Sequence, residues 1–179
     1  DTSGNVIVIG ISEGSGSAFD SATIKYSGSA GSLLWSARYT GPGDGTDSAT
    51  AVALDGGGNP VVSGYSDGAG GTAYVTLKYG SATGTILWTA RYSGAGPGYD
   101  EAQAVAVDAD GNVLVTGYSG GGDATGYDIA TIKYDGLTGA ILWSARYNGP
   151  GSGIDVGQAL VLDGGGNAIV TGYSLGSGS

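Results

Sequence analysis

The sequence contains no cysteine, no histidine and no methionine among its 179 residues. Without cysteine, the chain has no disulfide framework and no thiolate site. Without cysteine and histidine it has no Ser–His or Cys–His nucleophile and no imidazole metal site. Glutamate occurs only at Glu13 and Glu101. Asp100 and Glu101 would point to opposite faces of a strand, which argues against a hydrolytic carboxylate pair. The composition therefore argues against an enzyme.

Basic residues and long apolar runs are also scarce. Six lysines and arginines stand against 16 acidic residues, which gives a net charge of −10. Because an acidic surface repels phosphates, we expect neither nucleic acid nor an anionic membrane surface as a partner. No apolar run approaches the roughly 20 residues of a spanning helix, and no signal peptide opens the sequence. We therefore expect no membrane insertion.

Glycine is abundant, with 39 residues, and it separates short runs of alternating apolar residues. This pattern is typical of a turn-rich all-β chain. One segment of the sequence occurs three times and carries the tryptophans, which lie 53 and 55 residues apart at Trp35, Trp88 and Trp143. A fixed period in this range indicates a repeat architecture.

Each period divides into four predicted strands, which in the central copy are 103–108, 112–119, 129–134 and 141–147. The first two are joined by a D-x-x-G-N turn, whose left-handed residue is predicted at Gly58, Gly111 or Gly166. Four antiparallel strands in about 50 residues, repeated, are typical of a β-propeller blade. The predicted fold is therefore an all-β propeller.

Propeller geometry assigns a place to each strand. Small alanines in the first strand suit the crowded hub, and Trp35, Trp88 and Trp143 suit the rim, where blades diverge. We expect a partial blade at 1–41, blades at 42–94 and 95–148, and a partial blade at 149–179. Rings of this kind need about four to eight blades. The chain is therefore expected to be an arc of a longer or multi-chain propeller, and self-association through sheet edges is one route to closure.

The run GYDEAQAVAVDADGNVLVTGYS at 98–119 resembles the SBBP repeat, a seven-bladed β-propeller repeat of bacterial and archaeal extracellular proteins. The pattern recurs at 47–66 and 155–174, and its tail lies at 1–12. The element TGAILW at 138–143 is more similar to quinoprotein, or PQQ-like, propellers. The resemblance implies a seven-bladed ring, export to the cell surface or beyond, and no well-defined shared activity.

The basic residues occupy equivalent places in each repeat. They form either a stripe that binds an anion or a set of ion pairs between blades. We favour ion pairs with repeat-equivalent aspartates, because every repeat carries one lysine and one arginine. By strand alternation, Lys133 and Arg146 are expected on one face, opposite Trp143. The six residues are Lys25, Lys78, Lys133, Arg38, Arg91 and Arg146.

Two acidic sets are candidate cation ligands. The first spells D-x-D-G-N, part of a calcium loop without its closing bidentate acid, so a plain turn is favoured over Ca²⁺. The second set lies just before the hub strand. Its carboxylates would either ring one mouth of the channel or cap their own glycine-rich turns, and we favour the turn caps. No other cofactor is expected. The sets are Asp108, Asp110 and Asn112, and Asp47, Asp100 and Asp155.

These observations favour an exported, non-enzymatic propeller scaffold for surface binding, adhesion or assembly. A protein or glycan ligand would bind the loops that vary between repeats, at 12–20, 67–72 and 119–127. Tyr99 and Tyr127 lie in loops and would stack on sugars, whereas most other tyrosines fit the core. The alternatives are a fragment of a propeller enzyme, either a quinoprotein-like dehydrogenase or a carbohydrate-active enzyme, and the subunit of an extracellular filament.

Overall fold

The computed structural model describes residues 1–14, 18–43, 45–94, 96, 98–122 and 126–176, and in these residues it is built from strands and turns. The predicted loops 12–20 and 119–127 lie partly outside this range, at 15–17 and 123–125. No helix in the described part of the chain is long and apolar enough to cross a membrane. The strands are β1 (Val6–Glu13), β2 (Phe19–Tyr26), β3 (Leu33–Tyr39), β4 (Asp47–Leu54), β5 (Pro60–Gly68), β6 (Gly71–Tyr79), β7 (Ile86–Tyr92), β8 (Glu101–Val107), β9 (Val113–Gly120), β10 (Tyr127–Tyr134), β11 (Ile141–Tyr147), β12 (Asp155–Leu162) and β13 (Ala168–Ser174).

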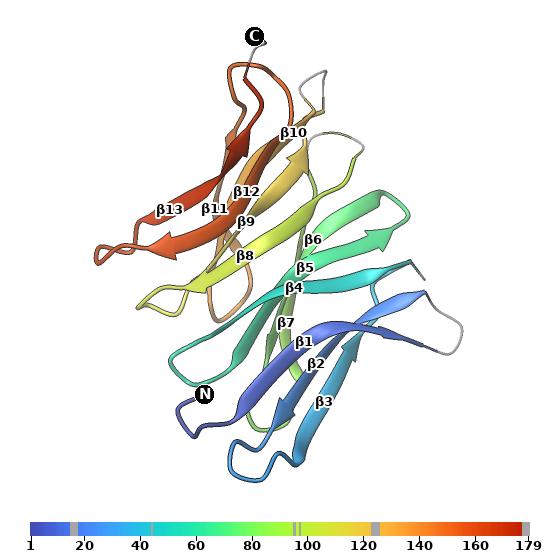
Figure 1. The fold of residues 1–179 in the computed structure, drawn as a ribbon, viewed down its shortest axis with the longest axis vertical. Helices are drawn as coiled ribbons and strands as arrows, with labels where there is room; N and C mark the ends of the chain where they lie inside the picture. The colour runs from blue at the N-terminus through green and yellow to red at the C-terminus, as the bar shows by residue number, and fades with distance from the viewer. Residues whose placement is uncertain (15–17, 44, 95, 97, 123–125, 177–179) are drawn as a thin grey trace.

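The strands form four antiparallel sheets, which we call blades 1 to 4 in chain order. Blade 1 is β1-β2-β3, blade 2 is β4-β5-β6-β7, blade 3 is β8-β9-β10-β11, and blade 4 is β12-β13. The blades follow one another from the N-terminus to the C-terminus, and β4, β8 and β12 lie side by side at the hub (Figure 1). The predicted fold class is confirmed: the chain is an open arc of a β-propeller.

The same turn precedes the second strand of each blade, and in blades 2 to 4 it joins that strand to the hub strand. In blade 3 the Oδ1 atom of Asp108 accepts hydrogen bonds from the backbone N–H groups of Asp110, at 3.0 Å, and Asn112, at 2.8 Å. Gly111 follows with a φ of +86°, a left-handed conformation that suits glycine. The turns at 1–5, 55–59 and 163–167 repeat these bonds. The D-x-x-G-N pattern therefore encodes the hairpin directly.

Each hub strand contains a β-bulge opposite a glycine. In blade 3 the register skips Gln103, and the equivalent residue skipped in blade 4 is Gln158. Gly117 faces the first bulge, and a Cβ atom at this position would overlap the carbonyl oxygen of Glu101. A bulge turns one side chain out of the ladder, and a glycine opposite allows the close backbone approach. Both glutamines consequently face the space between blades 3 and 4.

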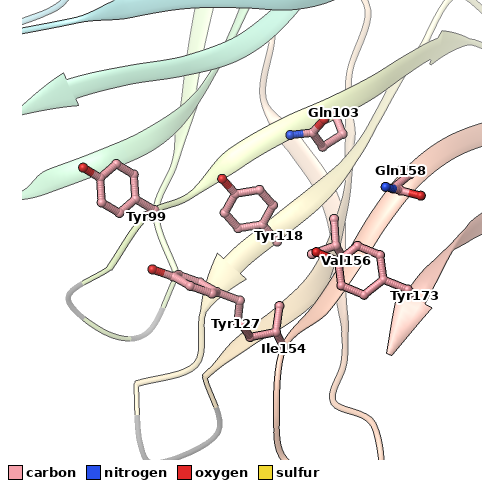
Figure 2. A pocket seen from close by; sticks show the side chains of 8 residues that line it. All are labelled: Tyr99, Gln103, Tyr118, Tyr127, Ile154, Val156, Gln158 and Tyr173. Carbon is pink, nitrogen blue, oxygen red and sulfur yellow. The ribbon is translucent and has the colours of Figure 1, made fainter. Parts of the chain in front are cut away.

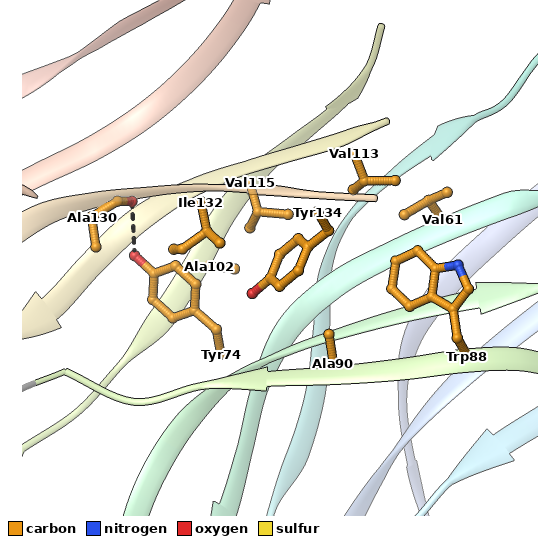
Figure 3. Close-up of a cluster of buried hydrophobic side chains, with 10 residues drawn as sticks. All are labelled: Val61, Tyr74, Trp88, Ala90, Ala102, Val113, Val115, Ala130, Ile132 and Tyr134. Atoms are coloured by element: carbon orange, nitrogen blue, oxygen red, sulfur yellow. Dashed lines mark hydrogen bonds between the residues drawn. The ribbon is translucent and has the colours of Figure 1, made fainter. Parts of the chain in front are cut away.

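The packing of blade 2 on blade 3 centres on Trp88. Its indole N–H donates to the carbonyl oxygen of Gly136 at 3.1 Å, and its ring lies 6.4 Å from that of Tyr134. A Cβ atom at Gly139 would lie 2.8 Å from the indole. Lys78 Nζ donates to the same Gly136 carbonyl at 2.7 Å. Figure 3 shows the two rings in the apolar core between these blades.

Blade 1 packs on blade 2 in the same way. Trp35 and Lys25 both donate to the carbonyl oxygen of Ser81, at 3.0 and 2.9 Å. The indole stacks on Tyr79, and a Cβ atom at Gly84 would lie 2.5 Å from it. We call this set of a tyrosine, a carbonyl and a left-handed glycine the indole seat. Blade 2 carries one for Trp35, and blade 3 carries one for Trp88.

The structure corrects the predicted placement of the basic residues. Lys133 lies directly across β10–β11 from Trp143, whereas Arg146 lies across from Ala130. Cross-strand partners share a face, so Lys133 and Trp143 lie together and Arg146 lies on the other face. The prediction that Lys133 and Arg146 share a face was wrong, because the pairing register and a bulge after Lys133 were not visible in the sequence.

The ion pairs also differ from the expectation, because they join residues within one blade. In blade 3, Lys133 lies 2.8 Å from Asp108 and Arg146 lies 2.9 Å from Asp128. Contacts between blades are instead made by lysine Nζ atoms and backbone carbonyls. In the described part of blade 2 no acidic side chain pairs with the arginine, and Ala73 stands where blade 3 has Asp128. The remaining pairs are Lys25–Asp1, Lys78–Asp55 and Arg38–Asp20, whereas Arg91 donates to Ser66.

These turns make stability sensitive to acid. Burial raises the pKa of Asp108, but hydrogen bonds from Lys133 and Asn112 outweigh it, and the net effect lowers the pKa. A carboxyl group with a lowered folded-state pKa contributes stability that is present above its unfolded pKa of about 3.9 and is lost as pH falls through the folded value. We expect urea denaturation to show a flat free energy of unfolding from about pH 5 to 8 and a decline below about pH 4.

Asp108→Asn should lower the free energy of unfolding at pH 7 by about 1–2 kcal/mol, because it removes a charge-assisted bond. It should also flatten the acid decline. Asp110→Asn, on the exposed side of the same turn, is the control. An acid profile that Asp108→Asn leaves unchanged would contradict this account of the turn.

Candidate functional site

A groove of about 540 Å³ lies between blades 3 and 4. We call it the tyrosine groove, because four of its lining side chains are tyrosines. Blade 3 and the turn before it supply one wall, and blade 4 with its preceding turn supplies the other (Figure 2). The lining residues are Tyr99, Gln103, Tyr118, Tyr127, Ile154, Val156, Gln158 and Tyr173.

A polar cluster orients the blade 3 wall. Tyr118 on β9 and Glu101 on β8 are register partners, and the Tyr118 hydroxyl donates to Glu101 Oε2 at 2.6 Å. Gln103 Nε2 donates to the other carboxylate oxygen at 2.8 Å. Burial, and then the adjacent Glu101, raise the pKa of Tyr118. The phenol therefore stays protonated at neutral pH and holds Glu101 and Gln103 in place.

The outer part of the groove presents aromatic surface. Tyr99 is 59% exposed and Tyr173 is 49% exposed. Tyr127 packs edge-on against Tyr118, with ring centroids 5.3 Å apart. Amide groups from Gln103 and Gln158 lie among these rings. A site with aromatic walls and a few fixed polar groups, with a volume in this range, is typical of small-ligand binding.

The structure brings together part of the predicted site. Tyr99 and Tyr127, which were expected to stack on sugars, line the same groove, although Tyr127 begins β10 and does not lie in a loop as expected. Tyr118 and Tyr173 were expected in the core, as strand tyrosines, but they line it too. Gln103 was missed, because strand alternation does not show a bulge. Its one signal was an amide in a hub strand that, after Glu101, is otherwise built from alanine and valine.

The predicted channel-mouth carboxylates are buried. Asp47 is 1% exposed, Asp100 is 2% exposed and Asp155 is 0% exposed. Each accepts a hydrogen bond from the N–H of a glycine six residues earlier, at 2.6, 3.0 and 2.7 Å, in the linker before the hub strand. The carboxylates therefore cap their own glycine-rich turns, the role that was favoured over a channel mouth.

The calcium candidate lies at the opposite end of blade 3. Asp108 uses Oδ1 for the backbone of Asp110 and Asn112, and Oδ2 for Lys133 and the Asn112 amide. Both oxygens are thus engaged in the turn. Among the described residues, no group of three or more acidic side chains converges as a metal site. The contacts of these residues account for the turn and give calcium no support.

Sheet topology, hub strands and indole seats place this chain in the β-propeller class. Residues 87–123 match the family model described as the beta-propeller repeat, SBBP, which is the repeat that the sequence resembles. No curated protein matches the chain. The similar solved structures include BamB from Moraxella catarrhalis, at 17% identity and a TM-score of 0.42 over 73% of this chain. That match covers 34% of the BamB chain, so this chain spans about a third of its length.

Proposed function

We propose that this chain is an exported propeller scaffold that binds a carbohydrate in the tyrosine groove without chemical turnover. The observation that carries the proposal is the convergence of four tyrosines and two glutamines from two blades on one groove of about 540 Å³. A sugar ring has apolar C–H faces and a rim of hydroxyls. Tyrosine rings suit the faces, and the glutamine amides suit the rim. Export to a bacterial or archaeal surface is the location that the SBBP resemblance implies.

The geometry suits recognition by a preformed site. Gln103 and Gln158 stand on bulges of two neighbouring hub strands, which hold them more rigidly than loops would. The carboxylate of Glu101 is fixed between two donors. A ligand would therefore meet groups that are already oriented, which lowers the entropic cost of binding.

The test is a glycan array followed by calorimetric titration of the best binder. Tyr99→Ala and Tyr173→Ala should each weaken binding about tenfold, because a lost aromatic contact of about 1.4 kcal/mol is a factor of ten. Tyr147→Ala is the matched control, since this tyrosine is similarly exposed, at 53%, but lies outside the groove. Binding that is unaffected by both groove variants, or no binder on a broad array, would overturn the proposal.

A further inference from the structure

The tyrosine groove is lined without any lysine or arginine. All six basic side chains of the sequence belong to the described residues, and each has its partners elsewhere. The three lysines pair with the aspartates of the D-x-x-G-N turns. Two arginines pair with aspartates of β2 and β10, and Arg91 donates to Ser66. No lysine or arginine of the chain is therefore left to neutralise a carboxylate at the groove.

Glu101 is the carboxylate that this charge balance leaves without a basic partner. Its oxygens accept hydrogen bonds from the Tyr118 hydroxyl, at 2.6 Å, and from the Gln103 amide, at 2.8 Å, and both donors are neutral. Both donors line the groove, and the carboxylate stands behind them. Burial, and then Glu101, raise the pKa of Tyr118 and also that of Tyr65 in blade 2. The negative field of Glu101 thus extends over this end of two blades.

Two further acidic residues flank the groove. Asp100 follows Tyr99 in the sequence, and Asp155 stands between Ile154 and Val156. Both carboxyl groups are buried and accept hydrogen bonds from the backbone N–H groups of glycines. A cleft that has apolar walls and charges of one sign concentrates ligands of the opposite charge. The electrostatics of the groove therefore favour a cation.

The aromatic walls favour a cation as well. Tyr99 is 59% exposed, and the rings of Tyr118 and Tyr127 lie 5.3 Å apart. Figure 2 shows the hydroxyls of these three tyrosines pointing to the same side, away from blade 4. The face of an aromatic ring attracts an ammonium group that lies within about 6 Å of the ring centre. Blade 3 and the linker before it supply all three rings, with a neighbouring blade on each side.

Neither Glu101 nor Tyr99 recurs in the neighbouring blades. Blades 2 and 4 build the same bulged hub strand and the same glycine-rich turn without them. The repeat fold therefore does not require an acid or an aromatic ring at these two positions. The corresponding residues are Ser48 and Val156 for Glu101, and Thr46 and Ile154 for Tyr99.

We propose that the tyrosine groove selects a ligand that carries an ammonium group, which among carbohydrates means an amino sugar with a free amine. This inference rests on the proposed function for the carbohydrate class of the ligand. The ammonium group lies against the ring faces of Tyr99 and Tyr118, and Glu101 supplies the opposite charge from behind the wall. An N-acetylated sugar keeps the stacking contacts but loses this attraction.

Calorimetric titration of the wild-type chain with two matched probes tests the selectivity. The probes are a tetramer of glucosamine and a tetramer of N-acetylglucosamine, at about pH 6, where a free amine is protonated. We expect the glucosamine tetramer to bind about tenfold more tightly, because it adds cation–π contacts and attraction to Glu101. The preference should shrink as salt rises from about 0.05 to about 0.5 M, because ions screen the charges.

Glu101→Gln tests the source of the preference. The glutamine oxygen can still accept a hydrogen bond from Tyr118, so the wall should stay in place while its charge is lost. We expect the preference to fall to about twofold or less, with binding of the N-acetylated tetramer nearly unchanged. Glu13→Gln removes the other glutamate of the chain, at the end of β1, and as the matched control it should keep the preference. A preference that survives Glu101→Gln, or that falls equally in Glu13→Gln, would overturn the proposal.

The wild-type titrations also distinguish this inference from the proposed function. Equal binding of the two tetramers, or tighter binding of the N-acetylated one, would overturn selection for an ammonium group and leave carbohydrate binding in place. Binding of neither tetramer would overturn the selection too. Only a broad glycan array without any binder would overturn carbohydrate binding itself.

Discussion

Gly117→Ala is expected to abolish the folding of blade 3 or to lower the free energy of unfolding by more than about 4 kcal/mol. The added methyl group would overlap the Glu101 carbonyl oxygen and would lie 2.9 Å from Ala102 Cα. Both obstacles are backbone atoms of the hub strand, so no rotamer change can relieve them. Relief requires the bulge at Gln103 to open, which breaks the β8–β9 ladder.

Gly10→Ala provides the matched control for this substitution. It makes the same change at the equivalent position of blade 1, where no hub strand lies within 4 Å. Its free energy of unfolding should stay within about 0.5 kcal/mol of wild type, as for surface substitutions. Urea denaturation of the dilute, monomeric chain, followed by circular dichroism, measures both. Equal destabilisation by the two variants would mean that the bulge is not the reason for glycine.

Trp88→Ala should lower the free energy of unfolding by about 3–5 kcal/mol, the usual cost of truncating a buried aromatic residue. The substitution removes the ring that packs on Tyr134 and over Gly139, and it leaves the Gly136 carbonyl with one donor fewer. The contact lies between blades 2 and 3, so cooperativity between these blades should fall too.

Trp143→Ala is the comparison variant, because it removes the same side chain from the same strand position of the next blade. Because Trp143 is 39% exposed and meets no seat among the described residues, its loss should cost less than about 1 kcal/mol. Denaturant titrations under identical conditions give the difference. Similar losses for both variants would contradict the assignment of Trp88 as a blade-to-blade anchor.

Local chemistry made much of the fold predictable. The D-x-x-G-N turns, the four-strand period and the left-handed glycines follow from short-range rules, and the expected strands of blade 3 agree with β8–β11 to within two residues. Register was not predictable in the same way. A bulge after Lys133 and another at Gln103 each change which side chains share a face, and alternation alone does not show them.

The candidate site depended on these hidden features. Tyr99 and Tyr127 were identified as loop tyrosines, but their common groove exists only because blade 4 closes over blade 3. Gln103 reaches the groove through a bulge, and Tyr118 reaches it from the end of a strand that was expected to be core. For Asp100 the sequence left two roles open, a channel-mouth ligand and a turn cap, and it favoured the turn cap. In the structure Asp100 is buried and accepts a hydrogen bond from the N–H of Gly94.

Acrylamide quenching of tryptophan fluorescence in the dilute chain tests the stacking of blades most directly, because the three indoles occupy equivalent positions. If successive blades dock through indole seats, wild type should show one readily quenched component and two protected ones. Trp143→Phe should remove the quenched component and leave the blue-shifted emission of Trp35 and Trp88. Three equally quenched indoles, or a quenched component that survives Trp143→Phe, would contradict the propeller arc described above.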